Sequence, residues 1–297
     1  MEQPIAEPEQ NGFFDRHTII GTVLLIVLSY LFILIPAAAA TGFVCAFFRL
    51  GDYTDYLGFA VVPMALLVLL LYWIILRPHY KGILFRGFTR TLRCCPVILI
   101  YWLLLFLPDF LEGCYPHTFT LKVISIAVTA GFSEEVIFRG LPMSYLKRQL
   151  RSEKQVPLIV CITGIVFGLI HLTNILIGAS VSASLVQFVT ASFIGIFFGA
   201  VLMRGGNIFV PILLHSLHDM LILAFQEADE VSAVLSEEAT GSDIIPTVLS
   251  VALGIFGFFL IRKSKRGEIC RMWADTWSQS TENQPEIPAE PKNTMEV

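Results

Sequence analysis

Charged residues are scarce in this sequence. Only 15% of its 297 residues are charged, while 55% are hydrophobic, and the mean hydropathy is +0.72. A soluble domain carries about a quarter of its residues as charged side chains. The shortage of charge therefore excludes an ordinary soluble domain and predicts a membrane protein.

Several features of other protein classes are also missing. The stretch before His17 lacks the basic start and short apolar core of a cleaved signal peptide, so we expect the first apolar segment to remain as an anchor. The six cysteines show no C-x-x-C spacing, which argues against a disulfide framework and a zinc ribbon. Because a glycine-rich phosphate loop and a basic nucleic-acid patch are absent as well, no nucleic acid is expected as a partner.

Long apolar runs are what the sequence does have. They cover 18–43, 57–76, 94–110, 120–146, 156–177, 184–203, 207–225 and 244–261. A helix needs roughly 17–25 such residues to cross the hydrocarbon core of a bilayer. The runs predict an all-α fold, a polytopic bundle of about eight transmembrane helices.

Lysine and arginine are concentrated in every second loop. They follow the second, fourth, sixth and eighth apolar runs, whereas the segment 226–243 on the other side is acidic. Basic loops stay on the cytoplasmic side of a membrane. We therefore expect a multi-pass protein of the cell membrane with both termini in the cytoplasm.

Composition divides the chain into five parts. Residues 1–17 form a cytoplasmic arm, 18–119 hold three scaffold helices, 120–225 form the polar core, 226–266 hold an acidic external loop and the eighth helix, and 267–297 form a cytoplasmic tail. The tail is rich in Pro, Glu, Asn, Ser and Thr, which predicts disorder.

Ionisable side chains lie in the interior of the apolar runs only within 120–225, since Asp109 stands at the outer edge of the third run. They fall in three groups: Glu134, Glu135 and Arg139; His171 with Phe167; and His215, His218 and Asp219. A charge at the centre of a membrane helix costs roughly 2.5–3.5 kcal/mol on an insertion scale, so such residues indicate function by default. The groups must converge in the bundle interior or in a water-filled cavity.

The three groups suit hydrolysis. A buried carboxylate beside a second carboxylate can take a proton from water, and a histidine can shuttle that proton or donate to an oxyanion. Glu135 and Arg139 lie four apart and could form a purely structural ion pair, but Glu134 would then lack a partner. We expect Arg139 to hold Glu135 charged and oriented and Glu134 to be the base, with the reverse assignment of the glutamates open. His218 is interpreted as a packing residue or as one that supports the site residues from behind.

The same residues resemble motifs of a known family, the CPBP group of CaaX prenyl proteases and bacteriocin-processing enzymes, also called the Abi domain. The first motif is two glutamates and, after three residues, arginine; the second is phenylalanine and histidine four apart; the third is histidine and, four later, asparagine or aspartate. They match Glu134, Glu135 and Arg139, then Phe167 and His171, then His215 and Asp219. The resemblance covers about 120–225.

The resemblance implies an intramembrane endopeptidase. A glutamate would activate water with a histidine assisting, the third-motif pair would stabilise the tetrahedral intermediate, and Phe167 would contact substrate. The partners would be the lipid bilayer and a membrane-associated or lipidated peptide or protein. The prenyl-protease branch tends to have asparagine where this chain has Asp219. Because an ionised aspartate cannot donate a hydrogen bond, Asp219 must be protonated, orient His215, or serve a different role.

Zinc is the cofactor to consider, because members of this family were long labelled as metalloproteases. A glutamate with two histidines is a legitimate zinc set. The sequence, however, has no H-E-x-x-H helix, and its ligands would come from three helices without a short chelating pair. We favour a metal-free site with no cofactor and keep zinc as the weaker alternative.

Two other functions use the same residues. A non-catalytic membrane immunity or interaction factor would keep the domain for binding, with the acidic loop 226–243 as its contact surface. A proton-coupled transporter would use the buried acids and histidines as a relay. The paired broken spans typical of transporters are missing, which disfavours the second.

Overall fold

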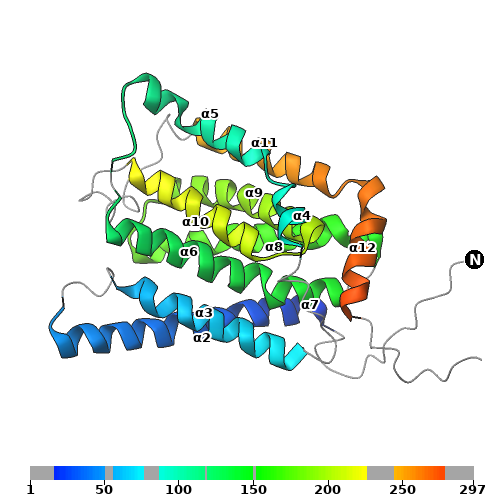
Figure 1. The fold of residues 1–297 in the computed structure, drawn as a ribbon, viewed down its shortest axis with the longest axis horizontal. Coiled ribbons are helices and arrows are strands. Elements are labelled where there is room, and N and C mark those ends of the chain that lie inside the picture. The colour runs from blue at the N-terminus through cyan, green and yellow to red at the C-terminus, as the bar shows by residue number, and fades with distance from the viewer. Residues whose placement is uncertain are drawn as a thin grey trace, which may run out of the picture.

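The computed structural model describes residues 17–50, 56–76, 87–117, 119–149, 152–225 and 244–277, and every element in them is helical (Figure 1). The α-helices are α2 (Thr18–Phe48), α3 (Leu57–Leu76), α4 (Phe88–Leu92), α5 (Val97–Leu111), α6 (Leu121–Arg139), α7 (Leu141–Gln149), α8 (Val156–Ile170), α9 (Val181–Gly205), α10 (Phe209–Ala224), α11 (Ile244–Leu260) and α12 (Lys263–Trp277). Two 3-10 segments, η4 (Glu153–Gln155) and η5 (His171–Ile177), flank α8. The predicted all-α class is confirmed for this part of the chain.

Among the described residues, fewer candidate membrane spans can be identified than the eight predicted. By length and composition, three described helical runs can cross a membrane: Thr18–Phe48, Glu153–Leu176 and Val181–Gly205. A fourth is possible if α11 and α12, bent by 71°, form one span. Each of the eight predicted ranges contains a helix, but α5 and α10 are shorter apolar helices, so eight spans are not confirmed.

The predicted span 120–146 is divided at Gly140. α6 ends at Arg139 and α7 begins at Leu141. Pro142 follows at once, and proline has no backbone N–H to continue the hydrogen-bond ladder of the preceding helix. The charged motif therefore lies in the last two turns of a helix.

The helices are arranged in layers (Figure 1). α2 and α3 pair on one side of α6 and α10, which pack along each other; α9 packs along α8 and α11 on the other side. Gly164 and Gly168 let α8 approach α9 closely, because a Cβ added to Gly164 would lie 2.8 Å from the backbone nitrogen of Ile196. This close packing places the site helices next to one another.

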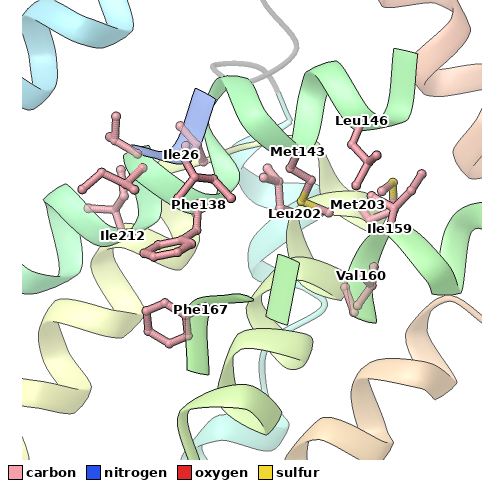
Figure 2. Close-up of a cluster of buried hydrophobic side chains, with 14 of the residues drawn as sticks. Ile26, Phe138, Met143, Leu146, Ile159, Val160, Phe167, Leu202, Met203 and Ile212 are labelled. Carbon is pink, nitrogen blue, oxygen red and sulfur yellow. The ribbon is translucent and has the colours of Figure 1, made fainter. Parts of the chain in front are cut away.

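An apolar core joins the site helices at one end. Figure 2 shows Phe138 and Met143 facing Phe167, Val160 and Leu202, which come from α6, α7, α8 and α9. The rings of Phe138 and Phe167 meet edge to face with their centroids 5.1 Å apart. Phe167 therefore belongs both to this core and to the second motif, so core packing holds the motif in place.

The predicted disorder of the carboxyl-terminal tail is wrong for 267–277. These residues continue α12, where Ile269 and Trp273 are fully buried and Trp273 Nε1 donates to the carbonyl oxygen of Met203 over 2.9 Å. Ile269 and Trp273 lie four apart on one helix face, a pattern that the polar composition of the tail as a whole concealed. Residues 278–297 lie outside the described residues.

Other predicted segments also lie outside the described residues. They are the amino-terminal arm up to residue 16, the basic stretch 77–86 and the acidic loop 226–243. The division into five parts and the cytoplasmic location of both termini remain predictions.

Candidate active site

The three polar motifs meet between α6, α8 and α10. α6 and α10 come close because Gly131 faces Ser216: an added Cβ would lie 2.8 Å from the Cα of Ser216. This approach lets His215 on α10 reach the acidic motif of α6, as the convergence argument predicts. The motif residues and their neighbours therefore share one site.

Glu135 is the buried hub of the site. Its Oε1 accepts hydrogen bonds from Nη1 of Arg139 and from Nδ1 of His215, each over 2.9 Å. Glu135 and Arg139 have no solvent exposure, so the spacing of four has produced a fully buried ion pair. Glu135 therefore holds the side chains of Arg139 and His215 in place.

Arg139 lies against aromatic rings and a glycine. Its guanidinium carbon is 4.3 Å from the centroid of the Phe167 ring, a cation–π contact. On α9, a Cβ added to Gly195 would lie 2.8 Å from Arg139 Nη2 and 2.9 Å from Phe167 Cδ1. Gly195 therefore provides the space for both side chains. From the sequence, its spacing to Gly199 indicated only close packing of helices.

His215 connects the buried hub to two accessible carboxyl groups. Its Nε2 lies 3.6 Å from Glu134 Oε2 and 3.6 Å from Asp219 Oδ2. The side chains of Glu134 and Asp219 are 27% and 24% exposed, whereas that of His215 is 6% exposed. Glu134 and Asp219 are thus the two acids of the site that water can reach.

Aromatic rings fix the orientation of His215. Phe198 stacks on it at 5.5 Å between centroids, and Phe167 meets it edge to face at 5.8 Å. A carboxylate oxygen can only accept, so Nδ1 carries the hydrogen donated to Glu135, and Nε2 is directed at Glu134 and Asp219. Phe198 belongs to an apolar stretch of α9, where no motif pointed to this contact.

His171 and His215 both contact the ring of Phe167. His171 meets Phe167 edge to face at 5.3 Å and begins η5. Its Nε2 is buried and has no hydrogen-bond partner among the described residues. Because buried polar atoms are nearly always hydrogen bonded, this unpaired nitrogen makes His171 a candidate site residue.

His218 is directed away from the acidic motif. Its Nδ1 accepts a hydrogen bond from Trp102 Nε1 over 3.2 Å, and its ring lies 5.6 Å from that of Tyr101. Trp102 and Tyr101 belong to α5, so His218 joins α10 to a neighbouring helix. The interpretation of His218 as a packing residue agrees with this geometry.

The contacts of His215 bear on the zinc alternative. His215 directs Nδ1 at Glu135, and its Nε2 lies 3.6 Å from Glu134 Oε2 and from Asp219 Oδ2. Among the described residues, no group of three His, Cys, Asp or Glu side chains could hold a metal ion.

The fold and the site define an all-helical membrane protein with a carboxylate, imidazole and guanidinium centre. Residues 116–221 match the family model described as "Type II CAAX prenyl endopeptidase Rce1-like". The matched segment contains every residue of the three motifs, so this part of the chain is similar to a family of endopeptidases and supports an assignment to the CaaX proteases. Searches of the curated proteins and of the solved structures found no match.

Proposed function

We propose that this protein is a CaaX-type intramembrane endopeptidase that hydrolyses a peptide bond in a membrane-associated or lipidated peptide. The observation that carries the proposal is the hydrogen-bonded chain from Arg139 through Glu135 to His215, which ends beside the accessible carboxyl group of Glu134. The family match over 116–221 supports the same kind of reaction.

Glu134 is the better general base of the two glutamates. Glu135 has no solvent exposure and uses Oε1 to accept from two donors. Glu134 is 27% exposed and lies beside His215, so water can approach its carboxylate. A general base must lie within hydrogen-bond reach of the proton that it removes. This contrast supports Glu134 as the base and Glu135 as a positioning residue.

The proposed reaction adds one water molecule across an amide bond. Glu134 accepts a proton from water as the water oxygen attacks the carbonyl carbon of the substrate. The carbonyl oxygen becomes an oxyanion and accepts a hydrogen bond from Nε2–H of His215, whose ring carries a hydrogen on both nitrogens in this scheme. Glu134 then passes its proton to the amide nitrogen, the C–N bond breaks, and a carboxylic acid and an amine leave.

His171 and Asp219 assist in this scheme. The buried Nε2 of His171 has no partner among the described residues and is assigned to a hydrogen bond with the attacking water. Asp219 lies 3.6 Å from His215 Nε2, which supports the orienting role among the alternatives for this residue. In that role Asp219 need not donate a hydrogen bond to the oxyanion.

Cleavage by purified full-length protein tests the proposal. The probe is an internally quenched peptide that ends in a farnesylated CaaX sequence, assayed in detergent. Glu134→Gln should reduce kcat by about 10²–10⁴-fold, the usual contribution of a general base. Glu268→Gln makes the same chemical change at a half-exposed surface position, where Glu268 pairs with Arg204, and should leave the rate unchanged.

Two further results would contradict the proposal. A rate unaffected by Glu134→Gln would remove Glu134 from the mechanism. A rate abolished by a chelator and restored by added zinc would replace the metal-free mechanism. The non-catalytic alternative instead predicts that a cellular phenotype survives Glu134→Ala combined with His171→Ala.

A further inference from the structure

An amide pair next to the site has no role in the mechanism above. Nδ2 of Asn174 donates to Oε1 of Gln187 over 2.9 Å and joins η5 to α9. Both side chains are half-buried. Among the described residues, neither side-chain amide makes another hydrogen bond. The pair therefore keeps unused hydrogen-bonding capacity at an accessible position.

The pair continues two faces that form the site. η5 begins at His171, and side chains three apart in a 3-10 helix eclipse each other, so Asn174 projects from the same side as His171. On α9, Gln187 shares a face with Gly195, two steps of four residues further along. A Cβ added to Gly195 would meet Arg139 and Phe167, so one face of α9 carries both Gln187 and the glycine that makes room for the catalytic groups.

The chemistry of two bonded amides matches one edge of a peptide chain. When one amide donates to the other, the first retains a carbonyl acceptor and the second retains an N–H donor. Exchanging oxygen and nitrogen in both side chains leaves the same combination, so this conclusion does not depend on their assignment. An extended peptide presents an N–H and a C=O on the same edge, which bind such a donor and acceptor.

Two buried polar atoms in the same elements also call for a ligand. His171 Nε2 on η5 and Ser184 Oγ on α9 are buried and have no hydrogen-bond partner among the described residues. Ser184 lies three residues before Gln187, one turn away on the same helix. This end of η5 and α9 therefore offers several polar atoms to something that the described chain does not supply.

We propose that Asn174 and Gln187 bind the main chain of the peptide substrate beside the bond that is cleaved. One amide donates to a substrate carbonyl oxygen, and the other accepts from a substrate N–H. The inference rests on the proposed peptidase function and adds the mode of recognition. Because Asn174 and Gln187 bind main-chain atoms, this part of the site tolerates different side chains in the substrate.

N-methylation of the substrate tests the proposal directly. The probe is the quenched, farnesylated CaaX peptide, with each N–H that flanks the cleaved bond replaced in turn by N-methyl. At one position we expect KM of the wild-type protein to rise about tenfold with kcat within about twofold, as expected for the loss of a hydrogen bond. Other N-methyl positions should have smaller effects.

Variants of the pair link that effect to the two amides. Asn174→Ala or Gln187→Ala should raise KM for the unmodified peptide about tenfold, and in at least one of them the sensitive N-methyl group should cause no further increase. Thr173→Ala is the matched control, because its exposed hydroxyl on the same turn donates to the carbonyl oxygen of Ile170. Its KM should equal that of the wild type.

The outcomes separate this inference from the proposed function. An N-methyl penalty that persists in both alanine variants, or a wild-type protein insensitive at every position, overturns the amide assignment. If one alanine variant does not fold, the scan on the wild type together with the other variant decides the question. A wild-type protein that cleaves no peptide overturns the proposed function and the amide assignment with it.

Discussion

The scaffold helix α2 and the site helices α6 and α10 satisfy their buried polar groups in different ways. In α2, the hydroxyl groups of Thr22 and Thr41 donate to carbonyl oxygens four residues earlier, each over 2.8 Å. In the site, Glu135 on α6 accepts from His215 on α10 as well as from Arg139. A local bond depends on one helix, whereas the site network depends on how two helices pack. Substitutions in the two regions should therefore have unequal effects.

The largest effect is expected when the hub is removed. Glu135→Ala leaves the fully buried guanidinium of Arg139 without its ion-pair partner. Breaking a buried pair in this way costs about 3–5 kcal/mol of stability and should also abolish cleavage. Thermal unfolding in detergent and the peptide assay measure the two effects.

A double variant separates stability from catalysis at the hub. Glu135→Leu combined with Arg139→Met replaces the pair by apolar side chains of similar size, which is often neutral for stability. We expect the double variant to unfold near the wild-type temperature while remaining inactive. A double variant as unstable as Glu135→Ala would show that the pair is not the source of the loss.

The next effect concerns the space that α9 leaves for the site. Gly195→Ala should cost about 1–3 kcal/mol through overpacking and reduce kcat, because the new methyl group displaces Arg139 and Phe167. Gly199→Ala is the matched control, since its nearest neighbour would be Thr163 Oγ1 at 3.5 Å, an ordinary contact. Equal losses in the two variants would contradict the role given to Gly195.

A smaller effect is expected from the bond that joins α10 to α5. Trp102→Phe removes the donor to His218 Nδ1 and should cost about 1 kcal/mol, the typical net value of a hydrogen bond. Because His218 is directed away from the acidic motif, kcat should stay close to the wild-type value. A large loss of kcat with unchanged thermal stability would move His218 into the catalytic machinery.

The smallest effect is expected in the scaffold. Thr41→Val keeps the shape of the side chain and removes a bond to the carbonyl oxygen of Ala37 within α2. Stability should change by less than about 0.5–1 kcal/mol, since the bond is local, and cleavage should be unaffected. An unfolding temperature lowered as far as in Glu135→Ala would end the contrast between the two regions.

Local spacing predicted the parts of the site that lie on one helix. Glu135 with Arg139 and Phe167 with His171 lie four apart, and both pairs are in contact in the structure. Spacing did not show which glutamate accepts the hydrogen bond from Nδ1 of His215. Glu134 and Glu135 differ by about 100° around α6, and the rotation of that helix is set by its packing against other helices. The choice between Glu134 and Glu135 as the base therefore depends on tertiary structure, which spacing along one helix does not give.

Features that arise between helices were harder to predict. Phe198 stacks on His215, and Gly195 makes room for Arg139, yet both belong to a stretch of α9 without ionisable residues. The prediction of disorder for 267–277 was wrong for a related reason. The polar composition after Gly267 concealed the apolar pair Ile269 and Trp273, which packs against other helices. The end of α6 at Arg139 depends on Pro142, a signal that was present in the sequence.

The most direct measurement is a single-turnover experiment with Glu134→Gln and the farnesylated quenched peptide. Binding is followed by titration of the labelled peptide, and cleavage by its rate at saturating protein. The account predicts affinity near that of the wild type, with cleavage slower by about 10²–10⁴-fold and no response to a chelator in the wild type. Cleavage within a few fold of the wild-type rate would contradict it.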